Sequence, residues 1–140
     1  MNAALWILQV LLGIFFLFTG VNHFIVPPGL PELMSWMYEL PAGLHYFSGT
    51  VEILAGLGLI LPGLTKIQTR LTTMAAVGLV LIMVGAMVWH IQRGEVANIF
   101  QNLILALLAG FVAYGRWRLK PLPERKPSPA GDESAHPIAN

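Results

Sequence analysis

The chain has 140 residues, of which 56% are hydrophobic and only 11% are charged, and its net charge is +1. Soluble domains contain about a quarter charged residues, so this composition indicates a membrane protein. The absence of cysteine excludes disulfide exchange, thiolate catalysis and cysteine-ligated metal sites within this chain.

The chain opens on a long apolar run. Residues 4–26 contain no Asp, Glu, Lys or Arg, and Pro27 and Pro28 end the run. Runs of about 18 or more apolar residues without charge are typical of membrane-spanning helices. The run lacks a basic start and exceeds the roughly 7–15 residues of a signal-peptide core, so we expect a retained first span.

The segment that follows the first span has a helical pattern. Apolar residues recur at helical spacing between residues 30 and 40, and Pro31 suits a first helical turn. We therefore predict a short helix over residues 30–40 that lies on the outer membrane surface. A plain loop that touches the lipid is the alternative.

Three further spans follow, and together the four predict an all-α, integral membrane, antiparallel four-helix bundle over residues 1–117. The predicted spans are residues 4–26, 42–61, 71–91 and 98–115. Pro41 and Pro62 bracket the second span. Residues 118–140 are basic at their start and rich in proline, and we expect a disordered cytoplasmic tail there.

The lysines and arginines predict the topology. Seven of them fall between the second and third spans or after the fourth span, and one falls on the opposite side. The seven are Lys66, Arg70, Arg116, Arg118, Lys120, Arg125 and Lys126, and the single one is Arg93. Because basic residues accumulate on the cytoplasmic side of membrane proteins, both termini are expected in the cytoplasm.

Polar side chains gather in the outer half of the predicted spans. They are Asn22, His23, Glu52, His90, Asn98 and Asn102. Glu52 shares a helix face with Gly49 and Gly56, and small residues mark the faces where membrane helices approach each other. We therefore predict an outward-opening ligand-binding or proton-relay pocket around Glu52, with Arg93 and Glu95 at its mouth.

Each of these residues also has a purely structural interpretation. Glu52 can be a neutral acid bonded to a neighbouring helix, and His23 and His90 can be interfacial histidines bonded to backbone or lipid. Arg93 and Glu95 can form a solvated pair in a loop. The asparagines can cap helices or bridge them.

Cofactor binding is only weakly indicated by these side chains. His23 and His90 lie at similar depth and could hold a haem, but two histidines alone are a weak signal. A metal bound by both histidines and Glu52 is chemically allowed without being better supported. We expect no metal site and no nucleic-acid partner, and the catalytic residues stay unknown.

Several segments, in this order, resemble the DoxX family of small four-helix membrane proteins. They are FLFTGVNHFIVP at residues 16–27, SGTVEILAGLGLILPGLT at 48–65, AAVGLVLIMVGAMVWHIQRGE at 75–95 and AYGRW at 113–117. The resemblance implies that the family's intramembrane acid matches Glu52. Asn22 and His23 stand where many members have lysine and leucine, and this departure leaves a shared ligand open.

The resemblance also implies a function. The family is named after a small subunit of a thiosulfate:quinone oxidoreductase, and other members are associated with membrane redox and oxidative-stress complexes. We therefore expect an accessory subunit of such a complex in a bacterial-type inner membrane, with a quinone as ligand and a membrane or redox protein as partner. The chain lacks a soluble catalytic domain, so it would not be self-sufficient as an enzyme. The alternatives are a non-enzymatic assembly factor or scaffold and a small transporter, and formation of a homo-oligomer stays open.

Overall fold

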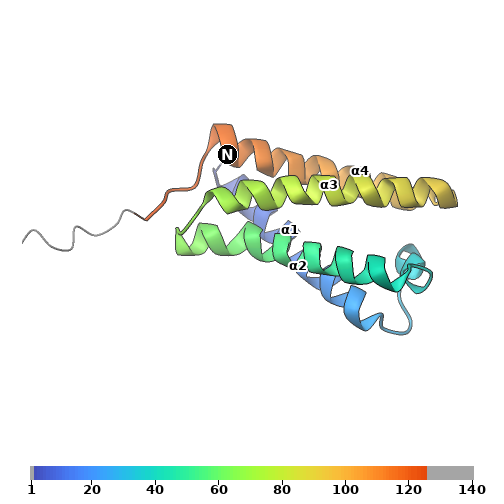
Figure 1. Cartoon of the computed structure of the whole chain (residues 1–140). Coiled ribbons are helices and arrows are strands. Elements are labelled where there is room, and N and C mark those ends of the chain that lie inside the picture. Colours follow the sequence, from blue (N-terminus) through green and yellow to red (C-terminus); the bar gives the residue numbers. More distant parts are fainter. Residues whose placement is uncertain (1, 126–140) are drawn as a thin grey trace, which may run out of the picture.

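The computed structural model describes residues 2–125, which form four long helices in antiparallel order (Figure 1). The helices are α1 (Asn2–Ile25), α2 (Ala42–Thr65), α3 (Arg70–Arg93) and α4 (Val96–Tyr114). Two short helical segments accompany them, η1 (Glu32–Tyr38) and η2 (Gly115–Leu119). The prediction of an all-α four-helix protein is confirmed.

Each of the four helices is long and apolar enough to cross a membrane. Counting η2 with α4, each contains 24 residues. At about 1.5 Å per residue this gives roughly 36 Å, which exceeds the roughly 30 Å of a bilayer core. The chain is therefore a multi-pass membrane protein.

The helix bounds agree with the predicted spans to within two residues, except at the end of α2. The sequence predicts an end before Pro62, but α2 continues to Thr65. A proline inside a helix leaves the carbonyl four residues earlier, here that of Gly58, without its usual partner. Gln9 of α1 donates a hydrogen bond to the next carbonyl oxygen, that of Leu59, at 2.5 Å. This hydrogen bond joins α1 to the backbone of α2 one turn before Pro62.

Glycines bring α1 and α2 into close backbone contact. A Cβ on Gly49 would lie 2.8 Å from the carbonyl oxygen of Gly20, and a Cβ on Gly56 would lie 2.8 Å from that of Gly13. Real Cβ atoms do not come this close to backbone, so only glycine fits at these positions. The small-residue face of α2 packs on α1, as its spacing predicts.

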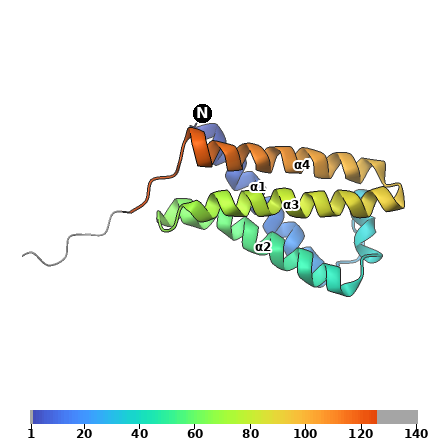
Figure 2. The ribbon, with the colours of Figure 1, turned by 45° about the horizontal axis from the view of Figure 1, so that its top comes forward.

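The four helices form two pairs that separate toward one end. α1 lies beside α2 and α3 lies beside α4, and the pairs diverge toward the end where η1 lies (Figures 1 and 2). We call this the η1 end, and the end that holds Asn2 and η2 the basic end. A buried apolar core that includes Leu59, Leu79 and Val112 holds the pairs together.

The segment predicted as a helix over residues 30–40 forms the 3₁₀ helix η1, which is hydrogen-bonded to its surroundings. Tyr38 donates its hydroxyl hydrogen to the Pro27 carbonyl oxygen at 3.0 Å. Asn98 of α4 donates to the Leu33 carbonyl oxygen at 2.9 Å. η1 is therefore bonded to the loop that follows α1 and to α4.

At the basic end, the chain folds back after η2. Leu122 is buried, and its carbonyl oxygen accepts a hydrogen bond from the Thr69 hydroxyl at 3.2 Å. The Arg125 amide donates to the Lys66 carbonyl oxygen at 2.8 Å. Of the predicted tail, residues 118 and 119 thus belong to η2, and residues 122–125 lie against the loop between α2 and α3. Residues 126–140 lie outside the described residues, and disorder of the tail stays a prediction.

Candidate functional site

Glu52 lies on the face of α2 that packs against α1. This face also contains His45, Gly49 and Gly56, which recur at helical spacing. Because the glycines let α1 come close, the Glu52 side chain is buried between helices, and the residue is 6% exposed. The hydroxyl of Thr19 on α1 donates a hydrogen bond to Glu52 Oε2 at 2.8 Å. The carboxyl group is therefore held in the interior of the bundle.

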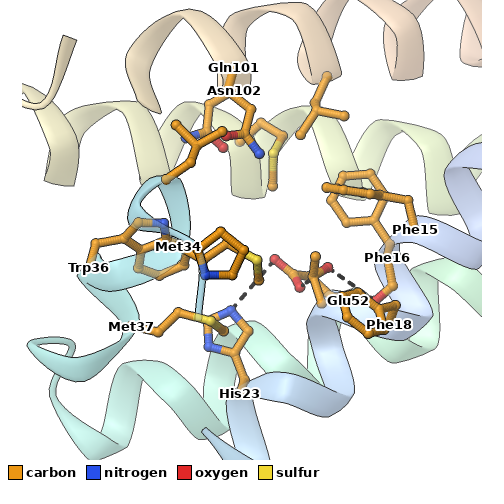
Figure 3. Close-up of a pocket in the computed structure, with 15 residues that line it drawn as sticks. Phe15, Phe16, Phe18, His23, Met34, Trp36, Met37, Glu52, Gln101 and Asn102 are labelled. Carbon is orange, nitrogen blue, oxygen red and sulfur yellow. Dashed lines mark hydrogen bonds and ion pairs between the residues drawn. The ribbon is translucent and has the colours of Figure 1, made fainter. Parts of the chain in front are cut away.

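His23, also on α1, faces the other oxygen of this carboxyl. Its Nε2 atom lies 3.8 Å from Glu52 Oε1, and both side chains are buried (Figure 3). The separation exceeds the roughly 3.2 Å of a good hydrogen bond. The two groups are therefore neighbours that attract each other without fully satisfying each other's hydrogen-bonding capacity.

A second histidine fixes the proton positions on the His23 ring. His45 Nε2 lies 2.8 Å from the Met37 carbonyl oxygen, which can only accept, so this nitrogen carries a hydrogen. The Nδ1 atom of a neutral His45 is then an acceptor. It lies 3.0 Å from His23 Nδ1, which must therefore donate. The Met37 carbonyl thus orients both rings through one chain of hydrogen bonds.

These hydrogen bonds occupy the other three ring nitrogens of His23 and His45. Nε2 of His23 is therefore the ring nitrogen of this pair that can exchange a proton with Glu52. If His23 is neutral, its Nε2 atom is an acceptor that faces the carboxyl group. An isolated charge is unfavourable inside a membrane, so a neutral acid beside a neutral imidazole, or a carboxylate beside an imidazolium, are the favoured states. In both states the pair holds one mobile proton and has no net charge.

Two cavities meet at this pair. The first has a volume of about 260 Å³ and is lined by α1, α4 and η1 (Figure 3). The second has a volume of about 210 Å³ and is lined by α2, α3 and η1. Both are lined by His23, Trp36, Glu52, Met83 and Asn102. The Glu52 carboxyl is therefore accessible from two sides of the bundle.

Both cavities include side chains from the outer surface of the helices. Phe18 lines the first cavity and is 61% exposed, and Phe47 lines the second and is 59% exposed. These exposed rings belong to membrane-spanning helices, so they face the lipid. Each cavity is therefore bordered by a ring that faces the lipid.

Each cavity is also lined by a residue with a buried polar atom that makes no hydrogen bond within residues 2–125. Gln101 lines the first cavity, and its Oε1 atom has no hydrogen-bond partner among residues 2–125. Trp89 lines the second cavity, and within the same residues its Nε1 atom has none either. Buried polar atoms are rarely left unpaired, so these atoms are available to a ligand.

His90 lies in the second cavity, on the far side of Trp36. The Trp36 ring centre is 5.7 Å from that of His23 and 5.3 Å from that of His90. His90 Nδ1 is 2.6 Å from Glu95 Oε2, so its described hydrogen bond leads away from Glu52. His23 and His90 thus both line the second cavity, with the Trp36 ring beside each of them.

The remaining predicted site residues have different positions. Glu95 accepts a hydrogen bond from Arg93 Nε at 2.7 Å, and Arg93 also pairs with Glu39, the residue that follows η1. Neither Arg93 nor Glu95 lines the two cavities at Glu52. Glu95 and Asn98 instead line an open hollow of about 600 Å³ beside η1.

Of the predicted asparagines, one belongs to the site. Asn102 lines both cavities and donates from Nδ2 to the Asn98 carbonyl oxygen at 2.8 Å. Asn98 anchors η1. Asn22 is buried but lines neither cavity.

The predicted site residues did not include five side chains of the site, namely Thr19, Trp36, His45, Trp89 and Gln101. His45 could have been found, because it lies on the Glu52 face of α2. Trp36 carried no such signal, since its position depends on how η1 folds over the helix ends.

The sequence model of the DoxX-like family matches residues 7–112. The chain belongs to the DoxX-like family. The matched region contains η1, both cavities and most of each long helix, so the site lies within the part that defines the family. No curated protein and no solved structure matches the chain.

Proposed function

We propose that this protein is an accessory subunit of a membrane redox complex and binds the head group of a quinone beside Glu52. One observation carries the proposal. The buried Glu52–His23 pair, which holds a single mobile proton, lies where two cavities meet, and both include lipid-facing side chains. This arrangement suits a lipid-soluble ligand that exchanges protons.

The cavities fit such a ligand in shape and polarity. Small-molecule sites are mostly apolar, with a few placed polar groups, and have volumes of about 300–1,000 Å³. Each cavity is slightly smaller than this, which suits a ring with its tail outside, at Phe18 or Phe47. The carbonyl oxygens of a quinone are acceptors, and the Glu52 carboxyl and the Trp89 Nε1–H group can donate to them.

The residues of the site would hold and transfer protons next to the ligand. A bound quinone supplies reversible two-electron, two-proton redox chemistry. Glu52 would hold a proton next to the ligand oxygen, and His23 would take up or return that proton at Nε2, while His45 keeps its ring oriented. The chain has no cysteine for a cluster or a dithiol, so we assign the electron source to a partner redox protein.

The basic residues support an orientation for this site. Seven lysines and arginines belong to the basic end of the bundle or to the chain that follows it, and Arg93 alone lies at the η1 end. By the positive-inside rule the basic end is cytoplasmic, and Glu52 then lies in the outer half of a bacterial-type inner membrane.

Quinone titration of the full chain in lipid nanodiscs tests the proposal. A short-chain benzoquinone should quench the fluorescence of Trp36 and Trp89, which line the cavities. Glu52→Gln should weaken binding about tenfold, because a carboxyl group is a stronger and titratable hydrogen-bonding partner. Glu39→Gln removes an exposed acid at the same end and should leave binding unchanged.

Two results would contradict the proposal. One is saturable quenching with the same affinity in Glu52→Gln, and the other is an absence of saturable quenching in the unmodified chain. In the second case, co-purification of membrane proteins that survives Glu52→Ala would support the assembly-factor alternative.

A further inference from the structure

A second polar site lies at the basic end, around a buried arginine. Arg116 of η2 is only 3% exposed. Its Nε atom donates to Gln9 Oε1 at 2.7 Å, and its Nη1 atom donates to Asn2 Oδ1 at 2.8 Å. The guanidinium group also lies 5.2 Å from the centre of the Trp6 ring. All these partners are electrically neutral.

The charge of Arg116 has no counter-ion within residues 2–125. The ion pairs of this region are all at the η1 end or at Glu52. The Nη2 atom of Arg116 is buried and lacks any hydrogen-bond partner there. A buried cation without a paired anion is strongly unfavourable. The planar guanidinium group of arginine can donate two parallel hydrogen bonds to the oxygens of a phosphate. The missing partner is therefore an anion with several oxygens.

A cavity beside Arg116 has room for this anion. It has a volume of about 490 Å³ and includes Arg70 and Thr73 from the first turn of α3. The N-terminus of a long helix carries a partial positive charge and favours anions. Glu124 bonds to the Thr69 hydroxyl at 3.3 Å and does not line the cavity. Two arginines and a helix N-terminus thus border one cavity.

The other walls of the cavity indicate which class of molecule would carry the anion. Met74 and Trp117 line it, and they are 65% and 61% exposed on the sides of membrane-spanning segments. Tryptophan is enriched at the height of the lipid head groups. The cavity therefore spans the boundary between the polar and apolar layers of the bilayer, where the phosphate of a phospholipid lies.

We propose that Arg116, Arg70 and the start of α3 bind the phosphate group of an anionic phospholipid at the basic end. The acyl chains would pass along Met74 and Trp117. The bound phosphate would supply the partner that Arg116 Nη2 lacks. This site is independent of the proposed quinone site, because it shares no lining residue with either cavity at Glu52.

Native mass spectrometry of the full chain, released from vesicles of equal parts phosphatidylglycerol and phosphatidylcholine, tests this proposal. The unmodified protein should retain phosphatidylglycerol in preference. Arg70→Gln should lower that preference about fivefold, the usual effect of one basic residue at an anionic lipid. Arg118→Gln is the matched control, because it removes the same charge from η2 but does not line the cavity.

If Arg116→Gln fails to fold, the substitutions at Arg70 and Thr73 still test the proposal. Thr73→Val removes a hydroxyl from the cavity wall without changing charge, and it should also lower the preference. Equal losses in Arg70→Gln and Arg118→Gln would overturn the proposal in favour of general charge attraction. Displacement of the lipid by millimolar inorganic phosphate would also overturn it, because the site would then take a free anion.

Discussion

His23 and His45 are joined through their Nδ1 atoms, which lie 3.0 Å apart. The bond has a fixed direction, because the Met37 carbonyl oxygen occupies the other nitrogen of His45. The histidine nearest to Glu52 is thus oriented by a backbone carbonyl in η1. A small segment outside the long helices therefore controls which nitrogen of His23 faces the buried acid.

This relationship predicts the tautomers of both rings. His45 should carry its proton on Nε2 and His23 should carry one on Nδ1, whichever state Glu52 adopts. Nitrogen NMR of histidine-labelled protein in bilayers reports these positions directly. His45→Phe should remove the Nδ1 preference of His23. A His45 ring protonated on Nδ1 would contradict the hydrogen-bond chain.

Much of the fold follows from the sequence because the membrane imposes simple rules. A long apolar run with few or no charges is typical of a membrane-spanning helix, and the spacing of Gly49, Glu52 and Gly56 predicts that the carboxyl group lies on a helix–helix face. The direction of Glu52 could therefore be predicted before any neighbour was known.

The partners of Glu52 could not be predicted in the same way. Trp36 reaches its position because η1 forms a 3₁₀ helix that is anchored by Asn98 and Arg93, and residues far apart in the sequence create that arrangement. The burial of Arg116 was missed for a similar reason. A basic residue at a span end is typical of a topology anchor, and only contacts to Asn2 and Gln9 make it part of the interior.

The glycine contact between α1 and α2 predicts a strong effect of one added methyl group. In Gly49→Ala the new Cβ would lie 2.8 Å from the Gly20 carbonyl oxygen and 2.8 Å from His23 Cβ. Backbone cannot move aside as a side chain can, so we expect a loss of about 1–3 kcal/mol in the free energy of unfolding. Thermal unfolding in detergent micelles measures this loss.

Gly78→Ala is the control for this change. Gly78 lies in the middle of α3, and nothing stands within 4 Å of a Cβ placed there. Alanine should be neutral or stabilise by up to about 1 kcal/mol. Equal effects of the two substitutions would show that α1 and α2 do not pack through their glycines.

The network of His90, Glu95, Arg93 and Glu39 predicts a pH dependence at the η1 end. Partial burial raises the pKa of Glu95, but hydrogen bonds from His90 and Arg93 outweigh it and hold the pKa below the ordinary value of 4.5. A lowered pKa means that the ionised form stabilises the fold above pH 4.5, and that this stabilisation disappears as the pH falls through the lowered pKa.

Melting temperatures measured between about pH 3 and pH 7 test this dependence. The unmodified protein should lose stability toward the acidic limit more steeply than Glu95→Gln, which lacks the titrating group. Glu32→Gln, an exposed acid of η1 outside this network, should follow the unmodified protein. Parallel curves for Glu95→Gln and the unmodified protein would show that the Glu95 contacts do not stabilise the fold.

Gln9 joins three helical segments, and its replacement should therefore be severe. Its amide nitrogen donates to the Leu59 carbonyl oxygen beside the proline of α2, and its oxygen accepts from Arg116 Nε. Gln9→Leu keeps the volume but leaves the buried Arg116 without this acceptor. We expect a loss of about 3 kcal/mol in the free energy of unfolding, since an unsatisfied buried cation is far less favourable than an unsatisfied neutral group.

Gln92→Leu provides the comparison for Gln9→Leu. Gln92 is exposed on α3, so the same exchange there should change the free energy of unfolding by less than about 0.5 kcal/mol. Unfolding by increasing concentrations of a denaturing detergent measures the free energy of unfolding of both variants under the same conditions. If Gln9→Leu were as stable as Gln92→Leu, Arg116 would have to find another acceptor, and its burial would not depend on α1. A stable Gln9→Leu variant with an exposed η2 would show instead that the basic end can open without unfolding the bundle.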